Sequence, residues 1–324
     1  MRFDDVEIAL DRVAKFYGFV KLSGWLHSPE ASLKSIEVLD NLVKSTTVEV
    51  GQYHSGVLNL GTDKGFSANV LLLEETFPYG MILRFHLDDG RVIDVPVKDL
   101  NREGFSRTNE SADVSKLFKS MVGEIRDSKV IDIGGRNRSK IDRSSDYPGS
   151  DLIVFDILDG DNVDVVGDAH QLSDYFPKNH FDAFVSVSVV EHILMPWKFS
   201  LELNKVLKVG ALGLVHTHQT LGIHDDPWDF WRFSKDAWPA IFNAKTGFEI
   251  LSSVHSLPTH VTPFYWRSEK EGVELSAGFE GSTVLVRKVS ESDLSWPVVV
   301  SDAISTSYPT DDDGFDPGLI DFEG

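Results

Sequence analysis

The chain has 324 residues, which suits one large domain or two unequal ones, and its hydrophobic content of 41% is enough for substantial cores. Its net charge is −20, from 31 basic and 51 acidic residues, and no run of Lys or Arg supplies the basic face that nucleic-acid binding requires. The absence of cysteine excludes disulfides, thiolate metal ligands and a cysteine nucleophile.

The N-terminal segment "MRFDDVEIALDRVAKF" is charged throughout and therefore lacks the apolar core of a signal peptide. No apolar run approaches the roughly 20 residues that a membrane span needs. We therefore expect a cytoplasmic protein with no membrane span and no nucleic-acid partner.

Residues 1–100 have the pattern of a small all-β domain. A short helix is expected over residues 4–15, and alternating runs separated by Gly, Pro, Ser or Asn follow it. The clearest is "HLDDGRVIDVPV", where Asp89-Gly90 between two alternating runs predicts a hairpin turn. Several strands at this spacing indicate a β-sandwich-like accessory domain. Residues 101–111 are polar, so we expect a linker there.

Residues 112–288 alternate between strand and helix patterns, which implies an α/β domain with a mostly parallel sheet and helices on both faces. Near the end, "FEILSSVHSL" and "STVLVRKV" have no helix between them, so these two strands are expected to pair antiparallel. Residues 289–324 are rich in Ser, Asp and Pro, and they are predicted to form an acidic disordered tail.

Three strand ends in this domain carry residues typical of a nucleotide-binding fold. In "KVIDIGGRNRSK" an apolar strand leads to Asp132, Gly134 and Gly135, and such glycines let the backbone approach a ligand closely. The next strand, "LIVFDI", ends at Asp156, where an acid typically binds ribose hydroxyls. "VVGDAHQL" then places Asp168 after a third strand.

Taken in series with "FDAFVSVSVVEHILMPWKFSLELNKVLKVGALGLVHT", these stretches resemble the class I S-adenosylmethionine-dependent methyltransferases, particularly the broad type 11 group. The resemblance covers about residues 112–288. It implies a Rossmann-like sheet, mostly parallel with one antiparallel strand, and S-adenosyl-L-methionine as the cofactor. The residues that it places around the cofactor are Asp132, Gly134, Gly135, Arg136, Asp156, Ile157, Asp168, Ala169, Ser186 and Glu191.

Within this set, the resemblance assigns Asp132 and Gly134 to the methionine end of the cofactor, Asp156 to the ribose and Asp168 to the adenine amine. Family members commonly have glycine where Arg136 stands. Because arginine could contact the cofactor carboxylate or an acidic substrate, we interpret this segment as a variant but working cofactor loop.

The segment "HTHQTLGIHDDPWDFWRFSKDAW" follows the fifth strand, which is the usual place for acceptor binding in this family. Its middle resembles a segment of methyltransferases in bacterial surface-polysaccharide pathways. Aromatic faces with carboxylates and histidines suit sugar rings, and two tryptophans three residues apart would share a face of a helix. The predicted substrate-binding residues are Asp225, Asp226, Trp228, Trp231 and Arg232.

Histidine is the expected catalytic base, because a sugar hydroxyl is a poor nucleophile and the pKa of histidine lies near neutrality. His224 is the first candidate, followed by His218 and His192. The same His/Asp cluster could instead hold a divalent ion that orients a sugar diol. The sequence does not favour a metal site, since His216 of the His-x-His pair is expected to be a packed core residue.

The sequence therefore predicts an S-adenosylmethionine-dependent O-methyltransferase that acts on a glycan or a glycosylated metabolite. A methyltransferase for a small aromatic or lipid acceptor is one alternative, and a non-catalytic methyltransferase-like binding protein is another. The N-terminal stretch "LSGWLHSPEASLKSIEVL" loosely resembles sandwich modules of glycan-modifying proteins. The N-terminal domain could equally hold a pathway partner or mediate a homo-oligomer.

Overall fold

The computed structural model describes residues 2–16, 18–41, 43–52, 64–73, 80–100, 109–137, 143–261 and 276–310. The chain divides into two compact units, Met1–Arg107 with His260–Ala277, and Thr108–Thr259 with Gly278–Gly324. Most of the expected linker, residues 101–108, lies outside the described residues. None of the described helices combines the length and the apolar character that crossing a membrane requires.

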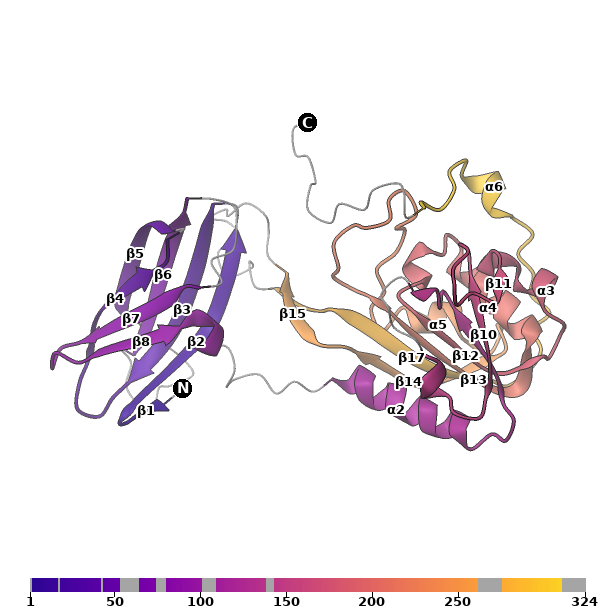
Figure 1. The fold of residues 1–324 in the computed structure, drawn as a ribbon, viewed down its shortest axis with the longest axis horizontal. Coiled ribbons are helices and arrows are strands. Elements are labelled where there is room, and N and C mark those ends of the chain that lie inside the picture. The colour runs from indigo at the N-terminus through magenta and orange to yellow at the C-terminus, as the bar shows by residue number, and fades with distance from the viewer. Residues whose placement is uncertain are drawn as a thin grey trace. The chain divides into compact units, whose positions relative to one another are not determined.

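The first unit contains two antiparallel sheets, one of five strands in the order β1-β2-β3-β6-β5 and one of three in the order β4-β7-β8 (Figure 1). Their buried faces share one hydrophobic core, in which the rings of Phe66 and Phe85 meet at 5.4 Å. The elements are β1 (Arg2–Phe3), β2 (Val6–Phe16), β3 (Phe19–His27), β4 (Leu33–Leu39), β5 (Val43–Gln52), β6 (Gly65–Leu72), β7 (Ile82–Leu87), β8 (Val92–Pro96) and α1 (Val97–Leu100).

Two expectations for this unit have opposite outcomes. The helix over residues 4–15 is wrong, because β2 occupies that stretch and buries Val6, Ile8 and Leu10, which alternate along a strand. The hairpin is confirmed: β7 and β8 pair antiparallel, and Gly90 in the turn has a φ of +91°.

The second unit is built on a seven-stranded sheet in the order β11-β10-β9-β12-β13-β17-β14. Only β17 runs antiparallel, pairing with both β13 and β14, so the expected antiparallel pair near the chain end is confirmed. The strands are β9 (Lys129–Ile133), β10 (Asp151–Asp156), β11 (Val165–Val166), β12 (Phe181–Val187), β13 (Leu207–His218), β14 (Phe248–His255) and β17 (Gly281–Lys288). A small sheet pairs β15 (Pro258–Val261) with β16 (Ser276–Phe279).

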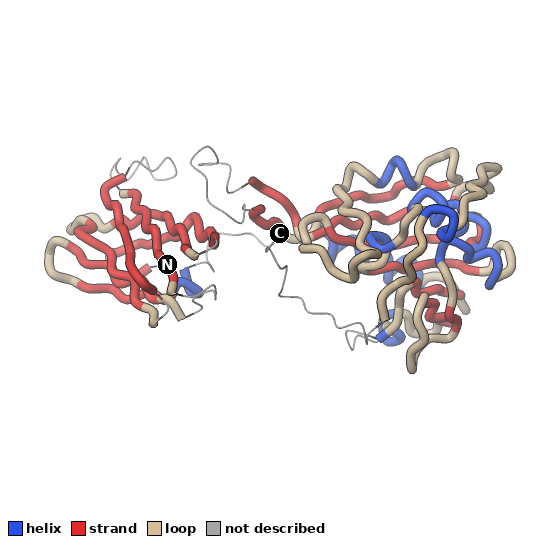
Figure 2. The backbone as a smooth tube through the Cα atoms, turned by 90° about the horizontal axis from the view of Figure 1, so that it is seen from above, coloured by secondary structure: helices blue, strands red, loops and turns tan. Residues whose placement is uncertain are grey.

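Helices cover both faces of this sheet, as the strand pattern predicts (Figures 1 and 2). Alternate residues of β9 point to opposite faces, so Ile131 and Ile133 join one core and Val130 joins the other. The helix α2 (Glu110–Gly123) buries Val114 and Phe118 in the second core. The remaining helices are α3 (Leu172–Tyr175), α4 (Pro196–Val206), α5 (Trp238–Ile241) and α6 (Val300–Ala303).

The strand order creates a crevice at the carboxyl ends of the central strands. The chain proceeds from β9 outward through β10 to β11, and it then returns to the other side of β9 as β12. The carboxyl ends of β9 and β12 therefore leave a gap between their outgoing loops, which is where open α/β sheets bind ligands.

The disorder expected from residue 289 is wrong for residues 289–310, which follow a defined path over the second unit. The side chain of Asn204 on α4 donates to the backbone oxygen of Ser290 at 2.8 Å. The buried ammonium of Lys198 donates to the oxygen of Val298 at 2.7 Å. Side-chain donors on α4 thus bind backbone carbonyls of this segment. Residues 311–324 lie outside the described residues.

Candidate active site

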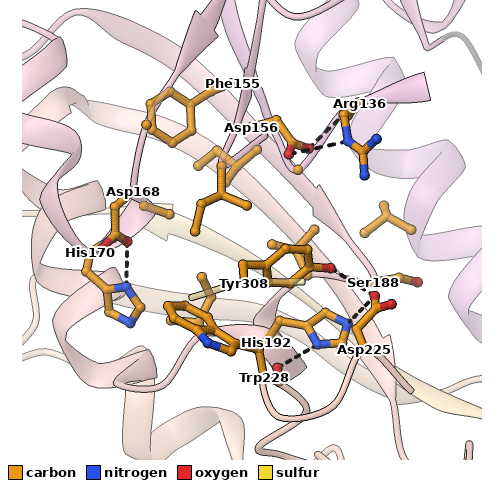
Figure 3. Close-up of a pocket in the computed structure, with 18 of the residues that line it drawn as sticks. Arg136, Phe155, Asp156, Asp168, His170, Ser188, His192, Asp225, Trp228 and Tyr308 are labelled. Carbon is orange, nitrogen blue, oxygen red and sulfur yellow. Dashed lines mark hydrogen bonds and ion pairs between the residues drawn. The ribbon is translucent and has the colours of Figure 1, made fainter. Parts of the chain in front are cut away.

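A cavity of about 560 Å³ lies at the carboxyl ends of β9, β10 and β12 in the second unit (Figure 3). Its wall brings together the predicted cofactor and acceptor segments of the chain. The predicted residues that line it are Gly134, Arg136, Asp156, Ile157, Asp168, Ala169, His192, His218, His224, Asp225 and Trp228.

Both glycines of the first loop are required by close packing. Gly134 has a φ of +74°, and a Cβ on it would lie 2.0 Å from Cγ2 of Val189. A Cβ on Gly135 would lie 2.6 Å from Cγ of Asp132. Gly134 lines the cavity, whereas Gly135 packs behind it, so the loop backbone itself forms part of the cavity wall.

Asp132 lies behind the loop and holds an arginine in place. Its side chain is 2% exposed, and Arg143 Nη1 approaches Oδ2 at 3.1 Å. Burial raises the pKa of Asp132, and the arginine opposes that shift. Asp132 is not on the cavity wall, but Arg143 is, so the carboxylate positions a cation that the sequence analysis did not identify.

Asp156 ends β10 with its carboxylate held by the backbone around it. The amide of Arg136 donates to Oδ2 at 3.2 Å, and the amide of Leu158 donates to Oδ1 at 3.0 Å. The guanidinium of Arg136 lies 3.8 Å from Oδ1, as Figure 3 shows. The arginine that replaces the common glycine therefore contacts the carboxylate expected to bind ribose.

Asp168 caps a 3₁₀ turn (Ala169–Gln171) and pairs with His170, which the sequence analysis missed. The amide of Met195 donates to His170 Nε2 at 3.2 Å, so Nδ1 carries the ring proton and donates to Asp168 Oδ1 at 2.6 Å. Burial alone would raise the pKa of Asp168, but the hydrogen bonds from His170 hold it below its usual value. A histidine two residues after the aspartate of "GDAH" was the available signal.

Two more predicted cofactor residues, Ser186 and Glu191, are off the cavity wall, as Asp132 and Gly135 are. Ser186 is fully buried within β12, and the wall is formed instead by Val187, Ser188 and Val189. The strand continues through Val187, and the chain turns at Ser188, where φ is +57°. The expected strand end was therefore set too early. Glu191 lies under the wall, fully buried.

Three histidines and one carboxylate line the acceptor side of the cavity. His192 Nδ1 donates to the backbone oxygen of Trp228 at 2.8 Å, and its Nε2 lies 3.8 Å from Asp225 Oδ2. His224 Nδ1 donates to the oxygen of Gly222 at 3.0 Å. In the neutral forms of His192 and His224, Nε2 is therefore the ring nitrogen that carries the lone pair. The ring of His224 lies 4.8 Å from that of His192 and 5.6 Å from that of His218.

The carboxylate of Glu191 is the buried centre of this histidine cluster. Its Oε2 accepts a hydrogen bond from Thr217, while Oε1 has no hydrogen-bond partner among the residues that the structure describes. Oε1 lies 3.3 Å from Nε2 of His218 and 4.0 Å from Nε2 of His192. Burial lowers the pKa of His218, although Glu191 opposes that shift, so the net result favours the neutral imidazole.

The acceptor segment is not helical, so its two tryptophans do not share a face. Trp228 is buried and lines the cavity, and its indole nitrogen donates to Thr306 at 3.2 Å. Trp231 is 37% exposed and lies off the cavity wall, where its indole donates to the backbone oxygen of Leu194 at 3.3 Å. Asp226 is exposed and is also not on the wall. Neither Trp231 nor Asp226 is therefore on the wall of this cavity, and their role in substrate binding stays a prediction.

Arg232 holds the segment together rather than facing the cavity. Its guanidinium forms two hydrogen bonds of 2.6 Å with Asp229, which also accepts from the amide of His224 at 2.8 Å. Burial would raise the pKa of Asp229, but the bond from Arg232 holds it below its usual value. Asp229 was missed, although its spacing of three residues from Arg232 suits an ion pair.

Tyr308, in the segment expected to be disordered, also lines the cavity. Its hydroxyl donates to Asp225 Oδ2 at 2.9 Å, and its ring lies 5.8 Å from that of His192 and 6.0 Å from that of Trp228. Figure 3 shows Tyr308 and Asp225 side by side on the wall. The C-terminal segment thus forms part of the same cavity wall as the predicted acceptor segment.

Comparisons with known proteins bear on the second unit. Residues 150–215 match the family model described as a methyltransferase domain. No curated protein sequence gives a significant match. Similar solved structures include the YcgJ protein from Bacillus subtilis, with 16% identity over 55% of this chain and 99% of that chain and a TM-score of 0.41.

Two further structures are similar at the same level. An S-adenosylmethionine-dependent methyltransferase from Aquifex aeolicus has 17% identity over 59% of this chain and 96% of its own, with a TM-score of 0.38. A 1,6-didemethyltoxoflavin-N1-methyltransferase from Burkholderia thailandensis has 13% identity over 57% of this chain and 80% of its own, with a TM-score of 0.39. The matched residues 150–215 lie within the second unit, and the order and directions of its seven strands agree with the mostly parallel sheet with one antiparallel strand that the sequence predicts.

Proposed function

We propose that this protein is an S-adenosylmethionine-dependent O-methyltransferase that acts on a glycan or a glycosylated metabolite. The observation that carries the proposal is one cavity with two kinds of wall. Gly134, Asp156 and Asp168 come from the strand ends where the sequence resemblance expects the cofactor. His224 and Trp228 come from the segment after β13, where an acceptor is expected.

The cofactor wall suits S-adenosyl-L-methionine in shape and in chemistry. Gly134 lines the cavity with its backbone in a left-handed conformation, which exposes main-chain groups to a ligand. Asp156 offers carboxylate oxygens oriented by two backbone amides, and Asp168 offers one oriented by His170. We assign Asp156 to the ribose hydroxyls and Asp168 to the adenine amine. Arg136 and Arg143, both on the wall, supply positive charge for the carboxylate of the methionine part.

The bound cofactor supplies an electrophilic methyl group, and the protein must align an acceptor oxygen with it. Such alignment contributes about 7–11 kcal/mol to lowering a barrier. On the acceptor wall, the indole of Trp228 offers an apolar face and Asp225 offers a hydrogen-bond acceptor, a combination that suits a sugar ring. His224 remains the first candidate for the base. Its Nδ1 donates to Gly222, which leaves Nε2 as the proton acceptor in the neutral ring.

A small aromatic acceptor is the second candidate. The rings of Trp228 and Tyr308 meet on the cavity wall at 6.0 Å with an angle of 80° between their planes. An aromatic substrate could stack on one ring and meet the edge of the other. A sugar would use the same faces but would also need the hydrogen bonds of Asp225.

Calorimetric titration with S-adenosylhomocysteine tests the cofactor assignment. The wild type is expected to bind with micromolar affinity. Asp156→Ala removes a charged hydrogen-bond acceptor worth about 1.5–3 kcal/mol, so the affinity should fall about 10- to 150-fold. Asp161→Ala is the matched control, because this neighbouring carboxylate is exposed and off the wall. Equal affinity for the Asp156 variant and the control would refute the cofactor assignment.

Methyl transfer to a panel of oligosaccharides and small phenols tests the acceptor assignment. The proposal expects turnover with at least one oligosaccharide, and Trp228→Ala should then raise the acceptor KM. Turnover of phenols alone would establish the second candidate. Cofactor binding without turnover of any acceptor would favour a non-catalytic binding protein.

A further inference from the structure

We propose that Glu191, His218 and His224 bind a divalent transition-metal ion at the acceptor side of the cavity. Each of these residues offers one ligand atom, and the three atoms lie within 4.8 Å of one another. His218 and His224 reach the cluster from the cavity wall, while Glu191 closes it from below. A ligand set of two imidazoles and a carboxylate is common for Zn²⁺ and similar ions.

One distance within the cluster equals the distance that a tetrahedral metal would impose. Two ligands on Zn²⁺ at bond lengths of about 2.0–2.1 Å and tetrahedral angles lie about 3.3 Å apart. Oε1 of Glu191 and Nε2 of His218 are separated by 3.3 Å. Oε1 makes no hydrogen bond in the described structure, although it is fully buried, so this acceptor is available to a ligand.

The surroundings of the cluster also match a metal site. His224 donates from Nδ1 to Gly222 and has Asp229 Oδ2 at 3.4 Å, so a backbone carbonyl and a carboxylate orient the ring from behind. Metal-binding histidines usually have such a partner on the second ring nitrogen, because it sets the tautomer and the direction of the lone pair. This contact of Nδ1 leaves the lone pair of Nε2 in the neutral ring for coordination.

The buried carboxylate of Glu191 has histidines, and neither lysine nor arginine, within ion-pair distance among the described residues. Among the described residues, only His192 and His218 lie within ion-pair distance of this carboxylate. A buried carboxylate without a partner is costly, and a divalent cation would remove that cost.

The role of the ion rests on the proposed function. An acceptor hydroxyl bound at an open metal position would have a lowered pKa. His192 would then accept its proton at Nε2, which faces Asp225 and Glu191. The new O–CH₃ bond forms as the S–CH₃ bond breaks, and the electron pair of that bond stays on sulfur. In this arrangement His224 is a metal ligand and His192 is the base.

Metal binding is tested on the full chain without a histidine tag, after EDTA treatment and removal of the chelator. Titration with Zn²⁺ should show one tight site, and bound Co²⁺ should give the visible absorption of a low-symmetry nitrogen and oxygen site. Loss of a metal's supporting partner typically costs about 10–100-fold in affinity, so removal of a ligand in His218→Ala or Glu191→Gln should cost at least about 100-fold. His86→Ala, a half-exposed histidine of the first unit, is the control.

The outcomes separate this proposal from the proposed function when S-adenosylhomocysteine is titrated into the same samples. Cofactor binding without stoichiometric Zn²⁺ binding overturns the metal site and leaves the methyltransferase intact. Zn²⁺ binding without cofactor binding supports the metal site and overturns the proposed function. Equal Zn²⁺ affinity in His218→Ala and His86→Ala also overturns the site. If either ligand variant fails to fold, the stoichiometry and Co²⁺ spectrum of the wild type still decide the matter.

Discussion

Replacing Gly134 with alanine should destabilise the second unit through two separable effects. The residue has a φ of +74°, a left-handed conformation that costs an L-residue roughly 1–2 kcal/mol. The new Cβ would also lie 2.0 Å from Val189 Cγ2, and relieving such an overlap typically costs about 1–3 kcal/mol. The expected loss in the free energy of unfolding is therefore about 2–5 kcal/mol.

Gly149→Ala provides a matched control for the backbone effect. Gly149 has a φ of +83°, but a Cβ there would meet nothing within 4 Å, so only the roughly 1–2 kcal/mol of backbone strain is expected. The difference between the two variants should therefore be about 1–3 kcal/mol. Adding Val189→Ala to the Gly134 variant should be less harmful than the sum of the two single changes.

Urea unfolding followed by tryptophan fluorescence measures these differences, with midpoints and slopes compared among the variants. Equal destabilisation by Gly134→Ala and Gly149→Ala would refute the reasoning, because it would mean that the loop moves away from Val189 without cost. Additive effects of Gly134→Ala and Val189→Ala would refute it as well.

Three further predictions concern the segment after β17, the adenine-side carboxylate and the histidine cluster. Deleting all residues after 305 removes the hydrogen bond from Tyr308 to Asp225, which is worth about 1.5–3 kcal/mol, and should lower the Tm by several degrees in a thermal scan. Deletion after 310 is the control. Equal Tm values for the two deletions would show that the contact does not contribute to stability. Because the pKa of Asp168 lies below its usual value of about 3.9, its ionised form stabilises the fold above that pH, and the advantage disappears as the pH falls through the folded-state pKa. In denaturant unfolding, the free energy of unfolding of the wild type should exceed that of Asp168→Asn by a constant amount from pH 7 to about pH 5. The difference should shrink below about pH 4. A difference that grows on acidification would contradict the hydrogen bonds from His170. His224→Ala should keep its affinity for S-adenosylhomocysteine and lose about two to four orders of magnitude in methyl transfer, whether the residue is base or ligand, and full activity would exclude both roles.

The sequence by itself determined the order of the elements in the second unit and the position of its cavity. Strand ends are local features: an apolar run that stops at Asp156, or at Gly134, can be recognised without knowing the rest of the fold. The parallel alternation then places those ends at one edge of the sheet, because each crossover returns the chain to the same side. The single antiparallel strand followed from the missing helix between the last two strands.

Only the tertiary structure decided which side chains reach the cavity, because loop direction depends on contacts between segments distant in sequence. Trp228 and Trp231 look equivalent in the sequence, yet of the two only Trp228 lines the wall. The segment that contains them forms no helix, and Arg232 binds Asp229 within it. Tyr308 is a plainer case: its surroundings are too polar to predict order, and its position is set by Asp225 and by donors on α4, more than 80 residues earlier in the chain. A sequence pattern reports local conformation, whereas these positions depend on hydrogen bonds that form only after the sheet and its helices have assembled.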